Sequence, residues 1–417
     1  MADVDNAPWL TFLGWGEGGT ESLTPASRYV LESADVIFGA RRHLRLLPPL
    51  DAEVREWPVP FADGIPLLLA ERALAERAWA ERVLPKRRRK VVMLVSGDPF
   101  WFGAGSILAR HLRAEEWQAM PQPSTFSLAA AHLGWPLERC SCLGLHARPL
   151  TRIRPYLHRG RRLLVLLRDA EAVAELAALL VRLGFGASQL HILEALGGES
   201  ERLRCVRADA ILPDDMAHPL AVGLSVDGDG LAIPLTPGLP DDLFEHDGQI
   251  TKQTVRAMTL AALAPAPGER LWDIGTGSGS IAIEWLLAHP HNQALAFECD
   301  EQRAARARRN AEVLGVDWLE VVEGRAPEVL SNQPLPDAVF VGGGLSQTLL
   351  ETLWQQLPAG TRLVANAVTL ESESLLAHWQ QQAGGELLRL ELASAAALGT
   401  RRGWKGSYPI VQWRVTR

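Results

Sequence analysis

The chain has 417 residues, more than one hydrophobic core usually spans, so two or three domains are expected. Hydrophobic residues make up 47% and charged residues 22%, the ordinary balance of a soluble globular protein. The net charge of −7 argues against a nucleic-acid-binding protein, because such proteins usually carry a basic domain.

The sequence also lacks membrane and targeting signals. It contains no uninterrupted apolar run of about 18 residues, so no membrane span is expected. Residues 1–9 are acidic and lack the charged-then-apolar pattern of a signal peptide. The cysteines are not spaced as a zinc site or a disulfide framework. We therefore expect a cytoplasmic protein with reduced thiols and no metal site.

The N-terminal half begins with a predicted strand at residues 9–13 and a glycine-rich turn that starts at Gly14. Thr24 is a typical helix N-cap and Pro25 a typical first helical residue, which predicts a helix up to residue 33. The next predicted elements are a strand at 34–39 and a helix at 67–84.

A basic run at residues 86–90 precedes the predicted buried strand 91–95. We interpret the run as a solvated connection, with contact to a polyanion as the alternative. The strand leads into the loop 96–105, which is rich in glycine and contains aspartate and proline. Because α/β proteins bind ligands in loops at the carboxyl ends of parallel strands, this loop is a candidate site.

A stretch rich in glycine and proline, residues 227–242, indicates a domain boundary near residue 235. Before it, further strands are predicted at 162–168, 191–194 and 220–226, and a helix at 171–183. We expect two domains, residues 1–235 and 236–417.

The second half alternates strands and helices, which predicts a largely parallel sheet. Strands are predicted at 271–274, 295–298, 319–323, 337–341, 362–366, 386–392 and 408–414. Helices are predicted at 251–263, from 280, at 301–314 and at 372–382, with Thr251 as a possible cap of the first. A basic, glycine-bordered loop is expected at 399–407.

The first strand of this half runs into a glycine turn. Asp273 precedes glycines at alternate positions, Gly275, Gly277 and Gly279, and helix-forming sequence follows. Such a turn lets backbone approach a ligand closely, and the helix start offers free N–H groups. The next strand ends at Glu298, whose carboxylate can bind both ribose hydroxyls. The pattern resembles Rossmann-like S-adenosylmethionine (SAM) methyltransferases, with another nucleotide-binding βαβ unit as the alternative.

Both halves resemble methylases of cobalamin biosynthesis. The N-terminal half is similar to tetrapyrrole methylases through its first glycine turn and residues 23–26, 34–39, 96–99, 123–127 and 145–148. The C-terminal half is similar to the family that methylates C15 of precorrin-6B and removes the acetate carboxyl of ring C, through residues 248–258, 273–280, 297–298, 324–328 and 336–344. Fused in this order, they resemble the bifunctional precorrin-6Y C5,C15-methyltransferases (decarboxylating). In one departure, Glu17 replaces the proline of the usual G-x-G-P-G turn.

The resemblance implies an α/β chain with an N-terminal tetrapyrrole methylase fold of two subdomains and a C-terminal Rossmann-like SAM methyltransferase fold. It implies methylation at C5 by residues 1–235, and C15 methylation with decarboxylation by residues 236–417. The product would be precorrin-8, an intermediate of cobalamin (vitamin B12) biosynthesis. Each domain would bind one SAM, and the partner would be a small tetrapyrrole, not nucleic acid or membrane.

The resemblance also implies site residues. Cofactor contacts are expected from Gly14, Gly97, Asp98, Ser124 and Thr125 in the N-terminal domain. In the C-terminal domain they are expected from Thr251, Gly275, Thr276, Gly277, Ser278, Gly279, Glu298 and Ala326. Contacts to the anionic substrate are expected from Lys252, Arg256, Arg401, Arg402 and Lys405. Glu298 would bind ribose, Ala326 would meet adenine through its backbone, and Thr251 would close over the cofactor. No catalytic acid or base is indicated.

Plainer roles stay open for some of these residues. Thr251 could be a helix cap, Asp98 a loop cap, and the basic residues 401–405 part of a solvated loop. Two other functions also stay open: an RNA methyltransferase, and an N-terminal half that binds tetrapyrrole without catalysis. The resemblance further implies a homo-oligomer formed through the C-terminal domain, which could be a tetramer.

Overall fold

The structure is a computed structural model that describes residues 8–80 and 89–417, with residues 75–80 described by their backbone alone. The predictions for residues 1–7, for the helix beyond residue 80 and for the basic residues 86–88 lie outside this description. The chain forms two compact units. Unit 1 comprises Met1–Arg148 and His158–Leu231, and unit 2 comprises Pro149–Leu157 and Ala232–Arg417.

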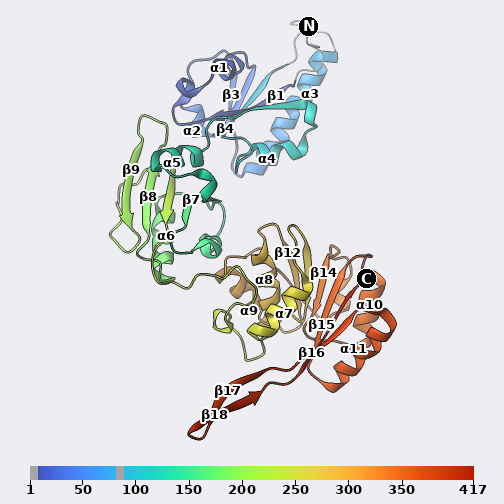
Figure 1. Ribbon diagram of the computed structural model, residues 1–417. Coiled ribbons are helices and arrows are strands. Elements are labelled where there is room, and N and C mark those ends of the chain that lie inside the picture. Colours follow the sequence, from blue (N-terminus) through green and yellow to red (C-terminus); the bar gives the residue numbers. More distant parts are fainter. Residues whose placement is uncertain (1–7, 81–88) are drawn as a thin grey trace. The chain divides into compact units, whose positions relative to one another are not determined.

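The first sheet of unit 1 is entirely parallel (Figure 1). Its strands are β1 (Leu10–Trp15), β2 (Val36–Gly39), β3 (Glu53–Glu56), β4 (Val91–Ser96) and β5 (Trp117–Met120), in the order β3-β2-β4-β1-β5. Its helices are α1 (Pro25–Glu32), α2 (Arg41–Leu44), α3 (Gly64–Ala80) and α4 (Gly105–Leu108). The predicted start of α1 is confirmed, because the Thr24 side chain accepts a hydrogen bond from the Ser27 amide.

The second sheet of unit 1 is mixed. It contains β6 (Cys140–Gly144), β7 (Arg162–Leu166), β8 (Gln189–Glu194), β9 (Arg202–Arg207) and β10 (Leu220–Ser225), in the order β6-β7-β10-β8-β9, with helices α5 (Thr125–Leu133) and α6 (Ala170–Arg182). Only β6 and β7 pair in parallel. The sequence pattern did not predict β3, β5, β6 and β9. All four are edge strands, and β3 and β9 carry many charged residues, so these two lack the apolar run of a buried strand.

Unit 2 has one seven-stranded sheet, in the order β13-β12-β11-β14-β15-β19-β16. Its strands are β11 (Arg270–Ile274), β12 (Gln293–Glu298), β13 (Glu320–Glu323), β14 (Ala338–Val341), β15 (Arg362–Ala367), β16 (Glu386–Leu390) and β19 (Ile410–Thr416). Its helices are α7 (Gln253–Leu263), α8 (Ser280–Ala288), α9 (Glu301–Val313), α10 (Gln347–Gln356) and α11 (Leu370–Ala383). The strands from β13 to β15 are parallel, whereas β19 and β16 pair antiparallel.

Helices cover both faces of this sheet (Figure 1). One apolar core joins the sheet to α7, α8 and α9, and the other joins it to α10 and α11. The buried strands carry apolar residues on both faces, as parallel strands between helix layers do. The sheet order reverses between β11 and β14, so the carboxyl ends of these two strands open a crevice. This architecture confirms the expected α/β class with a largely parallel C-terminal sheet.

A short segment from the middle of the chain also packs in unit 2. It forms the 3₁₀ helix η7 (Leu150–Tyr156) against α9. Arg152 donates two hydrogen bonds to the Asp317 carboxylate, at 2.6 and 3.0 Å, and its guanidinium lies 5.0 Å from the centroid of the Trp318 ring. These contacts place part of residues 1–235 in the C-terminal unit, which sequence reasoning could not foresee.

The basic segment expected as a loop at 399–407 is mostly a strand. Residues Ala393–Leu398 (β17) and Arg401–Gly406 (β18) form an antiparallel ribbon that extends away from the seven-stranded sheet of unit 2 (Figure 1). Gly399, with φ of 60°, supplies the left-handed residue of the turn between them. The prediction of a loop was wrong because glycine and charge dominate the composition, while the cross-strand pairing that makes the ribbon is not visible in it.

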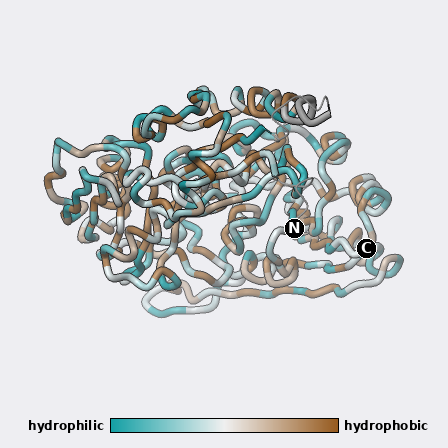
Figure 2. The backbone as a smooth tube through the Cα atoms, turned by 90° about the horizontal axis from the view of Figure 1, so that it is seen from above, coloured by the Kyte–Doolittle hydropathy of each residue, from teal (hydrophilic) through white to brown (hydrophobic). Residues whose placement is uncertain are grey.

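No helix in the described ranges is long and apolar enough to cross a membrane. Figure 2 shows hydrophobic and hydrophilic residues alternating over short distances along the backbone.

Candidate functional site

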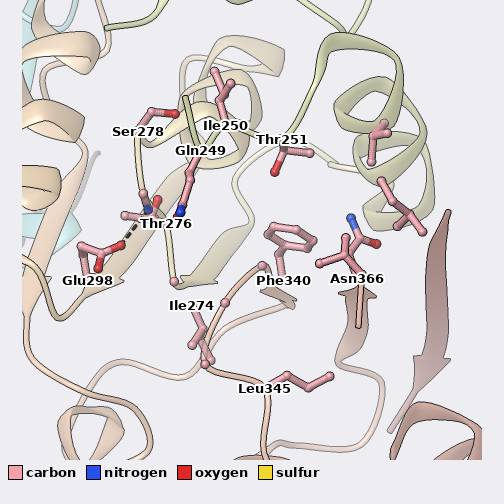
Figure 3. Close-up of a pocket in the computed structure, with 18 of the residues that line it drawn as sticks. Gln249, Ile250, Thr251, Ile274, Thr276, Ser278, Glu298, Phe340, Leu345 and Asn366 are labelled. Carbon is pink, nitrogen blue, oxygen red and sulfur yellow. Dashed lines mark hydrogen bonds between the residues drawn. The ribbon is translucent and has the colours of Figure 1, made fainter. Parts of the chain in front are cut away.

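A cavity of about 1570 Å³ lies in unit 2 at the carboxyl ends of the parallel strands (Figure 3). The ends of β11, β12, β14 and β15, the segment before α7, and the root of the ribbon contribute to its wall. Of the predicted site residues, it is lined by Thr251, Lys252, Gly275, Thr276, Gly277, Ser278, Glu298, Ala326 and Lys405. The sheet therefore brings most of the predicted C-terminal site together.

The turn after β11 requires glycine because its backbone is left-handed. φ is 71° at Gly275 and 59° at Gly277, where a side chain would be strained. A Cβ on Gly275 would lie 2.6 Å from the Cα of Gly343, whereas the nearest atom to a Cβ on Gly277 is 3.9 Å away. The turn is thus packed against the loop that follows β14 at one glycine and open to the cavity at the next, so a ligand can approach its backbone.

Glu298 holds the glycine turn and still faces the cavity. Its side chain accepts hydrogen bonds from the amides of Gly277 at 2.8 Å, Cys299 at 2.9 Å and Asp300 at 3.1 Å (Figure 3). The residue is only 5% exposed, so these charge-assisted bonds form in a poorly solvated place. A carboxylate has about four lone-pair sites, so at least one remains for a hydroxyl donor in the cavity.

Asp273 is buried beneath the same turn. One carboxylate oxygen accepts hydrogen bonds from the Thr276 hydroxyl at 2.6 Å and the Ala282 amide at 3.1 Å. The other oxygen has no partner among the described residues. Burial raises the pKa of Asp273 from 3.8 to about 6; the two hydrogen bonds oppose this shift and the charge of Glu298 adds to it. Asp273 therefore acts as a structural anchor between strand and helix.

This shift predicts a pH-dependent stability of unit 2. Because the folded pKa of Asp273 is above its ordinary value of 3.8, the unfolded chain ionises first as the pH rises. The free energy of unfolding should therefore fall between about pH 4 and pH 6, by roughly 3 kcal/mol from this group. Asp273→Asn is neutral throughout and keeps an oxygen for both donors. Urea unfolding at pH 4.5 and pH 7 should show a smaller loss in this variant; an equal loss would contradict the prediction.

The structure corrects the expectation for Arg256. This residue is fully buried, and its guanidinium donates to Glu284 at 2.5 Å and to the carbonyls of Thr251 and Leu239. Phe244 packs against it, with its ring centroid 4.7 Å from the guanidinium carbon. Arg256 cannot reach a substrate from this position, because its charge is used to fix the segment before α7.

Thr251 is not the cap of α7. The helix begins at Gln253, Lys252 occupies the cap position, and no side chain caps it. The Thr251 side chain instead points into the cavity toward Phe340 (Figure 3). The position of Thr251 is therefore compatible with the predicted role of closing over the cofactor, which stays a prediction. Arg256 holds the backbone of Thr251 in place through its hydrogen bond to the Thr251 carbonyl.

The predicted substrate cations fall into two groups. Lys252 and Lys405 line the cavity. Lys252 is largely exposed and lies 3.8 Å from Asp241. Arg401 and Arg402 are exposed on β18 and do not line the cavity. A direct contact from these arginines would require a ligand that extends out along the ribbon.

Unit 1 contains a second cavity, of about 390 Å³. Gly97 and Thr125 line it, as expected of cofactor contacts. Gly14, Asp98 and Ser124 lie outside its lining. A Cβ on Gly14 would overlap the Gly97 carbonyl; Asp98 accepts a hydrogen bond from the Phe100 amide at 2.8 Å, and Ser124 caps α5. These three residues shape the loops around the cavity, and their contacts to a cofactor stay predictions.

The residue that replaces the usual proline has a clear partner. Glu17 accepts a hydrogen bond from Arg42 at 2.5 Å, and Arg42 also donates to the Ser96 hydroxyl at 2.6 Å. Glu17, Arg42, Arg168, His146 and His218 all line the cavity. Burial lowers the pKa of both histidines, so near neutral pH the positive charge comes from the arginines. The sequence did not point to Arg42 or Arg168, because the acid at position 17 shows its need for a cation only once the fold brings Arg42 to it.

Other residues of the unit 2 cavity were also missed. Phe340, Leu345 and Asn366 lie in or just after strands β14 and β15 (Figure 3). Tyr408 lies at the root of the ribbon, between β18 and β19. The rule that ligands bind at the carboxyl ends of parallel strands could have identified the first three. Tyr408 had no such signal, because its place depends on the ribbon.

The residues present in unit 2 fit SAM. Gly277 leaves its backbone open to the cavity, and Glu298 retains acceptor capacity for ribose hydroxyls. The Ser278 hydroxyl is buried at the wall of the cavity and has no hydrogen-bond partner among the described residues. A ligand with polar groups at the glycine turn would satisfy it.

Comparisons with known proteins agree with this geometry. Residues 10–211 match the family model of tetrapyrrole (corrin/porphyrin) methylases, and residues 242–417 match the model of the precorrin methyltransferase domain. A precorrin-6Y C(5,15)-methyltransferase [decarboxylating] of Sinorhizobium sp. is 44% identical over 428 residues, which cover 100% of both chains. The protein of the same name from Mycobacterium tuberculosis is 39% identical over 98% of this chain and 100% of its own.

A solved structure is also similar in sequence. The C-terminal domain of precorrin-6Y C5,15-methyltransferase from Rhodobacter capsulatus is 49% identical, covers 44% of this chain and 100% of its own, and has a TM-score of 0.43. The comparisons confirm the resemblance found in the motifs and favour it over an RNA methyltransferase. The chain belongs to the family of precorrin-6Y C(5,15)-methyltransferases (decarboxylating).

Proposed function

We propose that the chain methylates a precorrin at two carbons and decarboxylates it, and that each unit binds one SAM. In this proposal unit 1 methylates C5, while unit 2 methylates C15 and removes the acetate carboxyl of ring C to give precorrin-8. The observation that carries the assignment is the unit 2 cavity, which runs from Glu298 to the ribbon root at Lys405 and Tyr408. Its volume of about 1570 Å³ exceeds that of a typical single-ligand pocket, roughly 300–1,000 Å³, so it has room for SAM and a large acceptor.

Methyl transfer from SAM requires mainly that the methyl group and the acceptor carbon are aligned. SAM supplies an electrophilic methyl group on a sulfonium, with a neutral thioether as leaving group. The chain must hold this group and the acceptor carbon in line, which can lower the barrier by several kcal/mol. In unit 2, Glu298 and the turn from Gly275 to Gly279 would fix the cofactor, Ala326 would meet adenine, and Thr251 would close over it.

Charge in the unit 2 cavity would orient the acceptor. Lys252 and Lys405 contribute to the wall and would pair with peripheral carboxylates of the tetrapyrrole. Arg401 and Arg402 on β18 would attract the anion from solution, since exposed charges act over about one Debye length.

In unit 1, Gly97 and Thr125 would contact SAM, and Arg42 and Arg168 would face the carboxylates of the acceptor. The bridge from Glu17 through Arg42 to Ser96 links the turn after β1 to the end of β4. This bridge would hold the turn after β1 in a fixed conformation, as the proline does in the usual G-x-G-P-G turn. The replacement by Glu17 is therefore compatible with a catalytic N-terminal unit.

Mass spectrometry of the products from the precorrin-6 substrate and SAM tests this assignment. The full chain should add two methyl groups and remove one CO2. Glu298→Ala should abolish the methyl transfer and CO2 loss of unit 2. Gly16→Leu should abolish the other methyl transfer, because Gly16 lines the unit 1 cavity and a Cβ there meets no atom within 4 Å, so the leucine side chain would occupy ligand space without disturbing the fold. Two methyl groups in the Gly16→Leu product would instead favour a non-catalytic N-terminal module.

We also propose that copies of the chain associate through the ribbon. Two-stranded ribbons are marginal alone, and this one exposes Leu398 (70%) and Trp404 (81%) together with unpaired strand edges. A second copy offers the same edges and apolar side chains. The free thiols of all four cysteines suit a reducing compartment, so we place the protein in the cytoplasm.

Trp404→Asp should therefore reduce the molar mass of the protein in solution, because it places a charge in the proposed interface. Light scattering after size-exclusion chromatography measures this directly. Tyr29→Asp changes an exposed aromatic residue of α1 in the same way and should leave the mass unchanged. A wild-type protein that is monomeric would refute the association.

A further inference from the structure

A buried polar cluster lies beneath the acceptor side of the unit 2 cavity. Asn366 is near the carboxyl end of β15 and lines the cavity beside Phe340 (Figure 3). Behind it are Thr259 of α7, which is fully buried, and Gln412 of β19, which is 4% exposed. Buried polar side chains are costly unless they are hydrogen-bonded, so three of them meeting at a cavity wall call for a functional explanation.

The hydrogen bonds of this cluster fix the amide of Asn366. The Thr259 hydroxyl donates to the Val255 carbonyl at 2.9 Å, so its oxygen is free to accept. It accepts from Nδ2 of Asn366 at 2.9 Å and from Nε2 of Gln412 at 3.3 Å. Oδ1 of Asn366 accepts from Nε2 of Gln412 at 2.9 Å. Only one N–H of the Asn366 amide is left for a ligand, and the amide nitrogen lies on the side toward Phe340 and Thr251 (Figure 3).

The position of Asn366 separates it from the proposed cofactor seat. Glu298 ends β12 and Asn366 is near the end of β15, three strand spacings or about 14 Å across the sheet. The sulfonium of SAM is bonded directly to the ribose carbon C5′, so it stays within a few bonds of Glu298. The N–H of Asn366 therefore points into space left for the acceptor.

The cavity wall to which Asn366 belongs has an apolar part, formed by Phe340, Leu345, Val368 and Leu390. Such a wall disfavours an anionic carboxylate relative to neutral CO2, while a single N–H can still orient the carboxylate. A cationic side chain at this place would instead stabilise the carboxylate and oppose its loss.

We propose that Asn366 donates a hydrogen bond to the carboxylate that leaves as CO2, and that Thr259 and Gln412 are positioning residues that act through it. This inference rests on the proposed function of unit 2. In the step, the bond between the carboxylate carbon and the side-chain carbon breaks, and its electron pair enters the conjugated macrocycle. CO2 leaves, and a proton from solvent restores the hydrogen on the side-chain carbon. The hydrogen bond from Asn366 holds the carboxylate so that the breaking bond is perpendicular to the macrocycle, where its overlap with the π system is greatest.

Asn366→Asp tests the proposal, because it keeps the shape, removes the donor and adds a negative charge. The ratio of CO2 released to methyl transferred by unit 2 should fall by about 10- to 100-fold, the effect of one hydrogen bond to a charged group. A methylated product that retains the carboxyl group should accumulate in mass spectra. SAM affinity should be unchanged. An unaltered ratio, an equal loss of both steps, or weakened SAM binding would each overturn the proposal.

Three further variants separate positioning from folding. Thr259→Val removes the acceptor of Asn366 and should lower the same ratio, whereas Thr259→Ser keeps the hydroxyl and should restore it. Asn332→Asp makes the matched change at an exposed residue outside the cavity and should leave the ratio unaltered. If Thr259→Val fails to fold, the Asn366→Asp ratio decides alone. A wild-type chain that transfers no methyl group to a precorrin refutes the proposed function, whatever the Asn366 variants do.

Discussion

Replacing Glu298 by alanine is expected to weaken SAM binding to unit 2 by about 100-fold or more. The substitution removes the acceptor for at least one ribose hydroxyl, and a hydrogen bond to a charged group is worth roughly 1.5–3 kcal/mol. The substitution also frees the Gly277, Cys299 and Asp300 amides, so the glycine turn loses its anchor. Both effects lower affinity at the same site.

Titration calorimetry on the full chain measures this effect and the stoichiometry together. The wild type should bind two SAM molecules, and Glu298→Ala should lose one of them while the site in unit 1 keeps its affinity. Glu320→Ala is a matched control, because Glu320 is exposed on β13, the strand beside β12. An unchanged two-site isotherm in Glu298→Ala would refute the ribose assignment.

Replacing Arg256 by methionine should destabilise unit 2 by about 3–5 kcal/mol, because it leaves the buried Glu284 carboxylate without its cation. Glu284 would still accept from the Gly238 and Leu239 amides, but the carbonyls of Leu239 and Thr251 would lose their donor. The segment before α7 should loosen, so SAM affinity in unit 2 should fall as well. The effect on an acceptor should be indirect, since Arg256 is sealed from the cavity.

Hydrogen exchange can localise this loss. Amides of β11 and α8 should exchange faster in Arg256→Met, while those of unit 1 should keep their protection. Arg309→Met is the control, since Arg309 forms an exposed ion pair with Glu245 that should contribute little to stability. Unchanged exchange in unit 2 would show that the buried pair does not hold this segment.

The sequence was sufficient wherever function depends on local backbone chemistry. Alternating glycines after an apolar strand, followed by an acid at the end of the next strand, specify a turn with positive φ and a carboxylate beside it. Gly275, Gly277 and Glu298 therefore meet in the structure as expected. The alternation of strands and helices likewise predicted the parallel sheet of unit 2, because each helix must return the chain to the same edge.

The sequence was insufficient wherever a residue's role depends on distant partners. Arg256 and Lys252 are close in the chain and equally cationic, but Arg256 points into the core toward Glu284, whereas Lys252 is exposed and lines the cavity. The basic residues at 401–405 suggested a loop, and only pairing with residues 393–398 makes them a strand. Neither outcome is encoded in a local pattern.

The sequence by itself determined the order of the two domains, the glycine turns, the acid at position 298 beside one of them, and the family. Only the tertiary structure decided which cations face a cavity, that residues 149–157 pack in unit 2, and that Thr259 and Gln412 stand behind Asn366. The physical reason is that turns and helix starts are set by neighbours in the chain. Burial and hydrogen-bond partners are instead set by packing between segments more than a hundred residues apart, as for Asn366 with Thr259 and Gln412 with Thr259.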